Sequence, residues 1–180
     1  MITVELKDEA VSAALARIAA ALTDMTPVMQ EIGEALVAST MDRFAAGVDP
    51  DGNPWAPKSA TTMDAYRSRG DTVSFKPLWG PSGALATTIH SVAGADQVRI
   101  GSGQVYAGVM QFGAAQGAFG ARAGRTRPTE KRPKSQDYFF HIPWGNIPAR
   151  PFIGLSEADR TNIVDMIDEW LSGVANGERS

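Results

Sequence analysis

Six basic side chains within thirteen residues form the one strong local charge signal in this 180-residue chain, whose net charge is −3. Guanidinium and ammonium groups at this density bind the phosphates of nucleic acid or the carboxylates of an acidic protein surface. The alternative is a solvated arm without a partner, because charge runs commonly have that role. The six residues are Arg122, Arg125, Arg127, Lys131, Arg132 and Lys134.

Catalysis by side chains needs several titratable groups that converge, and this chain offers few candidates. Its two histidines, His90 and His141, fall in predicted strands, and neither has a second ligand at a spacing that suits a metal ion. The chain has no cysteine, which excludes thiol nucleophiles, disulfides and cysteine-type zinc sites and fits folding in a reducing cytoplasm. We therefore predict a protein that is not an enzyme and needs no cofactor or metal, with both histidines as ordinary strand residues.

Two glycine-containing patterns resemble ligand-binding loops but lack the residues that those loops need. The stretch "DPDGN" begins like a calcium loop, but its glycine is fourth instead of sixth, and Ala60 stands where the twelfth position needs glutamate. The stretch "GSGQVY" lacks the third glycine of a dinucleotide-binding loop. We predict that "DPDGN" is a turn.

Composition limits the remaining classes of function. A sequence pI near 5.4 gives no reason to expect nucleic acid as the main partner, so any basic site must be local. The first ten residues, "MITVELKDEA", contain acids and no basic-then-apolar run, and no apolar stretch approaches the roughly 18 residues of a membrane span. We expect neither a signal peptide nor a transmembrane segment.

The N-terminal part, residues 8–47, is predicted to be helical. Apolar residues recur every three or four positions over residues 8–23, and again in a second helix that has Thr26 as its cap, begins with Pro27 and ends at Gly47. The two apolar stripes are Val11, Leu15, Ile18 and Leu22, and then Ile32, Leu36, Thr40 and Phe44. The proline-rich stretch "DPDGNPWAP" is a loop, and a short helix follows it from Ser59 toward Gly70.

Residues 78–155 are predicted to form a small antiparallel sheet. The stretches "SGALATTIHSVAG" and "QVRIGS" have the β-branched alternation of strands, and the glycine and aspartate between them indicate a hairpin. A short helix is favoured for residues 105–113, and "DYFFHI" is predicted to be a strand. Residues 114–136 contain glycines and prolines and have no apolar period, which predicts a long flexible loop.

The segment "HIPWGNIPARPFIG", residues 141–154, places three prolines around one arginine, Arg150. Proline restricts φ, lacks a backbone donor and favours an extended residue before it, so this segment is a stiff strap. Ser156 with Asp159 is close to a capping box, so a C-terminal amphipathic helix is predicted over residues 156–173. The order of helices, strands and helix predicts an α+β fold in a single domain of residues 1–180.

Three tryptophans, Trp55, Trp79 and Trp144, lie beside proline or glycine in predicted loops. A tryptophan in such a place either anchors its loop to the core or belongs to an interface with a partner, where tryptophan is enriched. Trp55, Trp144 and Arg150 are therefore interface candidates, together with the six cations of the basic run.

Four stretches of the chain, in order, resemble the phage virion-morphogenesis or tail-completion family of Mu-like phages and prophages. They are "RFAAGVDPDGNPWAPKSATTMDAYR", "SGAL" followed by "TTIHSV", "VRIGSGQVYAGVMQFG" and "IPARPFIGLSEAD", and they span residues 43 to about 172. The family usually has a histidine near Met110, a "TG-x-L" element instead of "SGAL", and a shorter basic loop. The motif residues here are Asp49, Asp51, Gly52, Trp55, Tyr106, Phe112, Gly113, Pro148, Arg150, Pro151, Phe152 and Gly154.

The resemblance implies a structural protein of the phage neck or tail end, assembled in the bacterial cytoplasm and retained in the virion. Copies would form a ring, expected to have six members, that completes the tail tube or joins the tail to the head. The partners would be other copies, the tail tube protein and head–tail connector proteins, with DNA at most passing through the lumen and no membrane involved. Two alternatives stay open: an assembly factor absent from the mature particle, and a nucleic-acid-binding module that uses residues 122–134.

Charge placement bears on how such copies would meet. Arg150, held extended before Pro151, could make a bidentate bond to a carboxylate of a neighbour, or could pair within its own subunit with Asp49 or Asp51. Of seventeen basic and twenty acidic side chains, six and one lie between residues 122 and 134, which leaves eleven and nineteen elsewhere, a balance of −8. We therefore predict that the basic run mainly contacts the acidic body of a neighbouring protein and only secondarily DNA.

Overall fold

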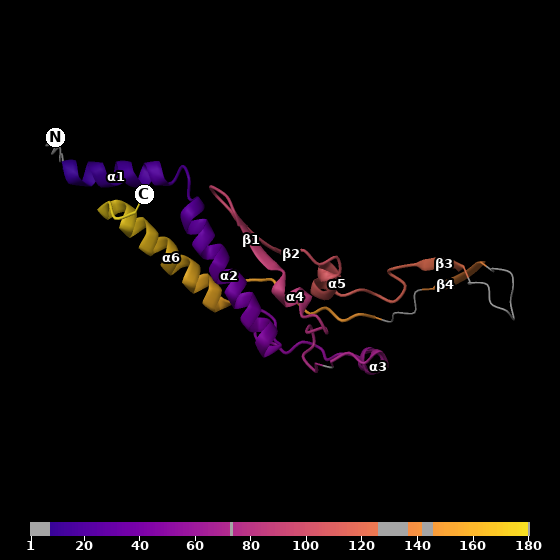
Figure 1. Cartoon of the computed structure of the whole chain (residues 1–180). Helices are drawn as coiled ribbons and strands as arrows, with labels where there is room; N and C mark the ends of the chain where they lie inside the picture. Colours follow the sequence, from indigo (N-terminus) through magenta and orange to yellow (C-terminus); the bar gives the residue numbers. More distant parts are fainter. Residues whose placement is uncertain (1–7, 73, 126–136, 142–145, 180) are drawn as a thin grey trace, which may run out of the picture.

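The computed structural model describes residues 8–72, 74–125, 137–141 and 146–179. Three long helices form one side of the molecule: α1 (Glu9–Ala21), α2 (Thr26–Ala46) and α6 (Glu157–Asn176). Helices α2 and α6 run side by side, and α1 crosses their end near the C-terminus (Figure 1). The opposite side of α2 carries an antiparallel hairpin of β1 (Ile89–Ala93) and β2 (Val98–Ser102).

The remaining elements lie toward the other end of the body. They are the short helices α3 (Ala60–Arg69), α4 (Ala84–Thr87) and α5 (Ala107–Phe112), and the strands β3 (Ala121–Arg125) and β4 (Asp137–His141). Strands β3 and β4 pair antiparallel in a second two-stranded sheet, which projects away from the helical body (Figure 1). The predicted mixed α+β class, with N-terminal helices, antiparallel sheet and C-terminal helix, is confirmed.

The ends of the two long helices follow local sequence rules. Gly47 ends α2 at φ +79°, a conformation that favours glycine. Ser156 and Asp159 form the predicted capping box of α6, with each side chain accepting a hydrogen bond from the backbone of the other residue. The prediction of Thr26 as the cap of α2 is wrong by one residue, because α2 begins at Thr26 and its backbone N–H and hydroxyl both donate to the carboxylate of Asp24.

The β1–β2 hairpin packs closely on α2, and a glycine permits the approach. A β-carbon placed on Gly33 would lie 2.8 Å from Ser91 Oγ and 2.9 Å from the side chain of Val98. Any larger residue would push the hairpin away from the helix. The predicted hairpin is confirmed, with Ala93 paired to Val98 beside the turn.

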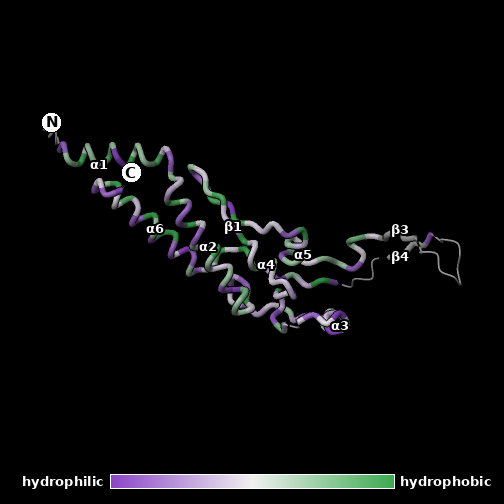
Figure 2. The backbone as a smooth tube through the Cα atoms, in the orientation of Figure 1, coloured by the Kyte–Doolittle hydropathy of each residue, from purple (hydrophilic) through white to green (hydrophobic). Residues whose placement is uncertain are grey.

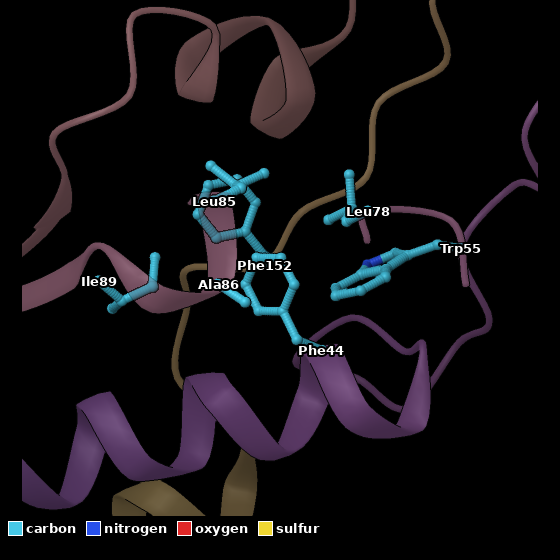
Figure 3. Close-up of a cluster of buried hydrophobic side chains, with 7 residues drawn as sticks. All are labelled: Phe44, Trp55, Leu78, Leu85, Ala86, Ile89 and Phe152. Carbon is cyan, nitrogen blue, oxygen red and sulfur yellow. The ribbon is translucent and has the colours of Figure 1, made fainter. Parts of the chain in front are cut away.

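Two hydrophobic clusters hold the body together, and α2 contributes buried residues to both. The first joins α2 to the loops around α4 and to the strap, and Figure 3 shows its aromatic rings facing each other across the cluster. Its buried residues are Phe44, Trp55, Leu78, Leu85, Ala86, Ile89 and Phe152. The second joins α2 to α6 through Val28, Ile32, Leu36, Trp170 and Val174. The core is therefore long and narrow, like the body itself.

Two predictions for the middle of the chain are corrected by the structure. Residues 84–87 form helix α4 instead of strand, because Gly83 adopts φ +63° and the Thr88 hydroxyl donates to the carbonyl of Ala84. Residues 114–136 were expected to be loop throughout, but 121–125 form strand β3 against a partner that begins at residue 137. That pairing depends on a segment distant in sequence, which local composition does not reveal.

Candidate interface around the proline strap

From here on, the strap means residues 147–155, the part that leads into α6. Side chains from three other segments hold it in place. Gln111 Oε1 accepts hydrogen bonds from the backbone N–H groups of Phe152 and Ile153, and its Nε2 donates to the carbonyl of Ile153. Trp55 Nε1 donates to the carbonyl of Pro151 at 2.8 Å. An extended, proline-containing chain has few bonds of its own, so these side chains satisfy the polar groups that a sheet would otherwise pair.

Arg150 is the cation of the strap, and it is buried. Its Nε donates to the carbonyl of Ala56 at 2.6 Å and its Nη2 to the carbonyl of Pro57 at 2.8 Å. The predicted pair with Asp49 or Asp51 of the same subunit is wrong about the acceptor, and the alternative of a carboxylate on a neighbour stays a prediction. Adjacent backbone carbonyls match the guanidinium fork as well as a carboxylate does, and the bond fastens the "DPDGNPWAP" loop to the strap.

A second arginine, Arg43 of α2, fastens the far end of the strap and was missed by the sequence analysis. It donates to the carbonyls of Phe152 and Gly154 and forms a buried ion pair with Asp159 at the start of α6. Burial opposes ionisation of Asp159, but hydrogen bonds from Ser39 and Ser156 and the charge of Arg43 hold its pKa below the ordinary value. The cap residue Asp159 was identified from sequence, whereas its partner lies 116 positions away.

Two glycines allow the strap to approach its neighbours closely. Gly113 has φ +73°, and a β-carbon there would lie 2.6 Å from the carbonyl oxygen of Ile147. A β-carbon on Gly154 would lie 2.6 Å from Pro50 Cγ. Because backbone atoms and a rigid ring cannot move aside cheaply, both positions require glycine. The strap therefore packs directly against α5 on one side and the 49–57 loop on the other.

The 49–57 loop contains a turn, as predicted for "DPDGN". The Asp49 carboxylate accepts hydrogen bonds from the backbone N–H groups of Asp51 and Asn53 and from the Asn53 amide. Desolvation favours the neutral form of Asp49 and acts to raise its pKa. The hydrogen bonds from Asn53 and Asp51 favour the carboxylate more strongly, so the pKa of Asp49 is lowered. Gly52 takes φ +83° at the tip. Asp49, the first of the acids that resemble calcium ligands, thus closes the turn.

Lys58 sits next to this loop and is anchored by carbonyls. Its Nζ donates to the carbonyl of Ser74 at 2.5 Å and to that of Trp79 at 2.6 Å. Burial, and then the nearby charge of Arg150, lowers the pKa of Lys58. These bonds hold the loop that contains Trp79 against the core, so the role of Lys58 is structural.

The tryptophan candidates take different places. Trp55 is buried in the first cluster, with its ring edge-on to Phe44 at 5.4 Å between centroids, so it anchors its loop to the core and is not available at the surface (Figure 3). Trp79 is partly exposed. Trp144 lies outside the described residues, as do Arg127, Lys131, Arg132 and Lys134.

Apolar side chains remain exposed around the strap. Phe112 is 80% exposed at the end of α5, and Val105 and Tyr106 are exposed at its start, although the other face of α5 packs on the first cluster. Leu155 is exposed where the strap meets α6, and Pro148 is exposed within the strap. Of the family-type motif residues, Phe112 and Tyr106 therefore face solvent, whereas Arg150 and Phe152 are structural.

Helix α1 has an open apolar face. Val11, Leu15 and Leu22 are 54%, 60% and 50% exposed, and none of the helix residues is buried. The helix is attached by its other side, where Ile18 packs on the second cluster and Arg17 donates to the last carbonyls of α6. Hydrophobic residues recur along α1 (Figure 2), but of the predicted stripe only Ile18 packs on the second cluster.

The β3–β4 ribbon brings cations and aromatic residues into register. Arg122 is paired with Phe140, Gly124 with Tyr138, and Arg125 with Asp137 across the two strands. A backbone bridge between Ala114 and Ile147 joins the base of the ribbon to the strap. The strap thus supports the ribbon as well as the core.

Two shallow grooves flank the outer face of α2. One, of about 390 Å³, lies between α2 and α6, and the other, of about 310 Å³, lies between α2 and β1. Within the described ranges, no cluster of histidine and acidic side chains could hold a metal ion. None of the helices in those same ranges is long and apolar enough to cross a membrane.

Sequence comparison identifies a family for the chain. The model of the phage virion morphogenesis family matches residues 6–172 of the chain. No curated protein and no solved structure matches it. The match covers the strap, the 49–57 loop and the projecting α1 and ribbon together, so these elements belong to one inherited unit.

Proposed function

We propose that this chain, which belongs to the phage virion morphogenesis family, is a structural subunit of the phage neck or tail end. Copies associate in a closed ring, with six as the expected number, and the ring completes the tail tube or joins it to the head. The neighbours above and below are the tail tube protein and head–tail connector proteins, and DNA passes through the lumen. The subunit assembles in the bacterial cytoplasm and stays in the virion.

The observation that carries this proposal is the contrast between a rigid body and two projecting elements. Helix α1 buries no residue of its own, and the β3–β4 ribbon extends away from the body (Figure 1). An isolated two-stranded ribbon is marginally stable in water, and short helices need an apolar face covered. Both elements would gain cover from neighbouring copies in a ring.

The strap suits the role of a ring subunit for an entropic reason. Association costs conformational freedom wherever a surface segment must become ordered. Pro148 and Pro151 restrict the strap before assembly, and the bonds from Arg43, Gln111 and Arg150 hold it against the core. Surfaces supported by the strap, including the exposed end of α5, are then presented in one conformation.

Electrostatics favours protein over DNA as the partner of the ribbon. The described surfaces of α2 and α6 are acidic, whereas the ribbon and its connecting residues hold the six cations. An acidic ring would let DNA slide without binding, while a basic ribbon would attract an acidic neighbour. Tight, salt-sensitive DNA binding by the free chain would instead support the nucleic-acid-binding alternative.

Electron microscopy of the purified full chain, together with its mass in solution, tests the ring directly. We expect closed rings of uniform size at high protein concentration. Mass spectrometry of purified particles then separates a virion component from an assembly factor, because only the former is present at the copy number of the ring. A strictly monomeric chain, absent from the particle, would contradict the proposal.

A further inference from the structure

The groove between α2 and α6 is open on the surface of the body and has a mixed lining. Alanines make the groove shallow, and its lining includes three larger apolar side chains, Leu36, Ile163 and Met166. Serine, asparagine and aspartate supply polar groups. The residues that matter here are Ala35, Ala38 and Asp42 of α2, and Asn162, Ile163 and Met166 of α6. The volume of about 390 Å³ is open to solvent and has room for side chains of another segment.

The two helices that form this groove carry an excess of negative charge. Together they hold eight Asp or Glu and two Arg. Arg43 neutralises Asp159, which also lines the groove, while Arg160 pairs with Glu157 and Arg179 with Glu31 and Glu169. The unpaired acid of the lining is Asp42, which is exposed and has no ion-pair partner among the described residues. The groove therefore fits a segment that combines cations with apolar side chains.

The β3–β4 ribbon has that composition. Strand β3 contains Arg122 and Arg125, and strand β4 contains the run Tyr138, Phe139 and Phe140. Arginine, tyrosine and phenylalanine are the residue types enriched at protein interfaces. An isolated two-stranded ribbon is marginally stable in water, so the β3–β4 ribbon would gain stability from a partner surface.

The ribbon cannot reach the groove of its own subunit. Figure 1 places the α2–α6 pair on one side of the molecule and the ribbon beyond the opposite side, with α5 and the β1–β2 hairpin between them. Contact must therefore come from another copy. Because ribbon and groove are different surfaces, the contact is head-to-tail, and repetition of such a contact closes a ring when the rotation allows it.

We propose that the β3–β4 ribbon of one copy docks in the α2–α6 groove of the next copy. The arginines of the ribbon face Asp42 and the neighbouring acids of α2 and α6, and apolar residues of the ribbon cover the apolar floor. This inference rests on the proposed ring and names the surface that receives the ribbon. It also explains why an acidic helical body and a basic ribbon occur in one chain.

Cysteine cross-linking tests this contact in the full chain, which has no cysteine of its own. The double variant Ala123→Cys with Asn162→Cys has one thiol on the ribbon and one in the groove. Treatment with a short bismaleimide should give a ladder of covalent multimers that ends at the ring number. A mixture of the two single variants should stop at covalent dimers, because each copy then has only one reactive end. A control pair, Ala123→Cys with Asp64→Cys on the exposed α3, should give no ladder.

Charge exchange provides a second readout. Asp42→Lys should reduce the ladder about tenfold at low salt, because the lysine repels the cations of every incoming ribbon. The matched change Asp64→Lys on α3 should leave it unchanged. Arg122→Glu and Arg125→Glu, added to Asp42→Lys, should restore the ladder.

The outcomes separate this inference from the proposed function. Rings of the unmodified chain without any ribbon-to-groove ladder would overturn the docking inference and leave the ring intact. Absence of both rings and ladder would overturn both. A ladder that is insensitive to Asp42→Lys and to salt would remove the electrostatic basis of the contact and so overturn the inference.

Discussion

The strap and helix α1 both contain large apolar residues, but these are buried in the strap and exposed on α1. Phe152 of the strap is 1% exposed and lies between Phe44 and the loops around α4, whereas Leu15 of α1 is 60% exposed. The strap is held by arginine, glutamine and tryptophan side chains, whereas α1 is held by one arginine and the edge of the second cluster. The difference indicates that the strap maintains the subunit, while α1 is available to a partner.

The same contrast separates two arginine-rich regions. Arg43 and Arg150 are buried and donate to backbone carbonyls or to Asp159, so they act as structural fasteners. The cations of the β3–β4 ribbon belong to an element that projects from the body. The charge of an arginine alone therefore does not show whether it stabilises the fold or binds a partner. Its burial and its hydrogen-bond partners distinguish the two roles.

The largest expected effect is the loss of an aromatic ring from the strap cluster. Phe152→Ala should lower the free energy of unfolding by about 3–5 kcal/mol, because it empties a fully buried site. Trp55→Ala should cost a similar amount, since it also removes the bond to the Pro151 carbonyl. Urea denaturation measures both, and the exposed Phe112→Ala is the control, expected near zero. Losses below about 0.5 kcal/mol at Phe152 and Trp55 would mean that the strap is not packed on the core.

The buried ion pair at the end of the strap should have nearly as large an effect. Arg43→Ala leaves Asp159 buried without its counter-charge, and breaking such a pair costs about 3–5 kcal/mol. Arg67→Ala, which breaks the exposed pair with Asp64, should cost under about 1 kcal/mol. Urea midpoints compare the two variants. Equal losses would show that burial does not distinguish these pairs.

The pH dependence of stability follows from the same pair. The pKa of Asp159 is lower in the folded protein than its ordinary value of 3.8, so its contribution is complete above that value. As the pH falls through the folded pKa, the carboxylate is protonated and the contribution is lost. Urea midpoints at pH 7 and near pH 3 should therefore differ more for the unmodified chain than for Asp159→Asn. An equal difference would assign the acid sensitivity to other carboxylates.

The local elements near the strap could be predicted from sequence, because their signals lie within a few residues. The capping box at Ser156, the hairpin after β1 and the stiff strap itself all depend on neighbouring residues. The fasteners could not be predicted in this way. Arg43 and Asp159 are 116 positions apart, and the acceptors of Arg150 are backbone carbonyls that have no sequence signature.

The candidate site shows the same limit. The basic run is visible in sequence, but its division into strand β3 and a following segment depends on pairing with a distant strand. The groove between α2 and α6 has no motif, since it results from short residues such as Ala38 and Ala158 meeting across two helices. Composition revealed the acidic balance of the body but not where the acids gather.

A glycine substitution tests how rigidly the strap is held against α5. Gly113→Ala should lower the free energy of unfolding by more than about 1 kcal/mol, since the residue has φ +73° and its β-carbon would meet backbone atoms. Gly103→Ala is the control, because a β-carbon there meets nothing within 4 Å. Thermal denaturation compares the two. A neutral result at Gly113 would show that the strap can shift.

Helix α1 should respond in the opposite way to the core. Leu15→Ala should change the free energy of unfolding by about 0.5 kcal/mol or less, as expected for an exposed site. The matched change Leu85→Ala removes a leucine that is 3% exposed and should cost about 2–5 kcal/mol. If α1 meets a neighbouring copy, Leu15→Ala should also raise the protein concentration needed for ring formation. Unchanged assembly would make α1 an appendage of its own subunit.

The smallest expected effect on the fold comes from the basic run. Replacing Arg122, Arg125, Arg127, Lys131, Arg132 and Lys134 by serine should leave the melting temperature nearly unchanged, because the role predicted for these cations is in association and not in folding. Each solvated ion pair contributes under about 1 kcal/mol to association, but contacts repeated round a ring act together and should weaken with salt. Ring formation should therefore fall sharply in the substituted chain, and raising the salt concentration should mimic this loss in the unmodified chain. If the substituted chain still forms rings and completes infectious particles at normal yield, the basic run is only a solvated arm.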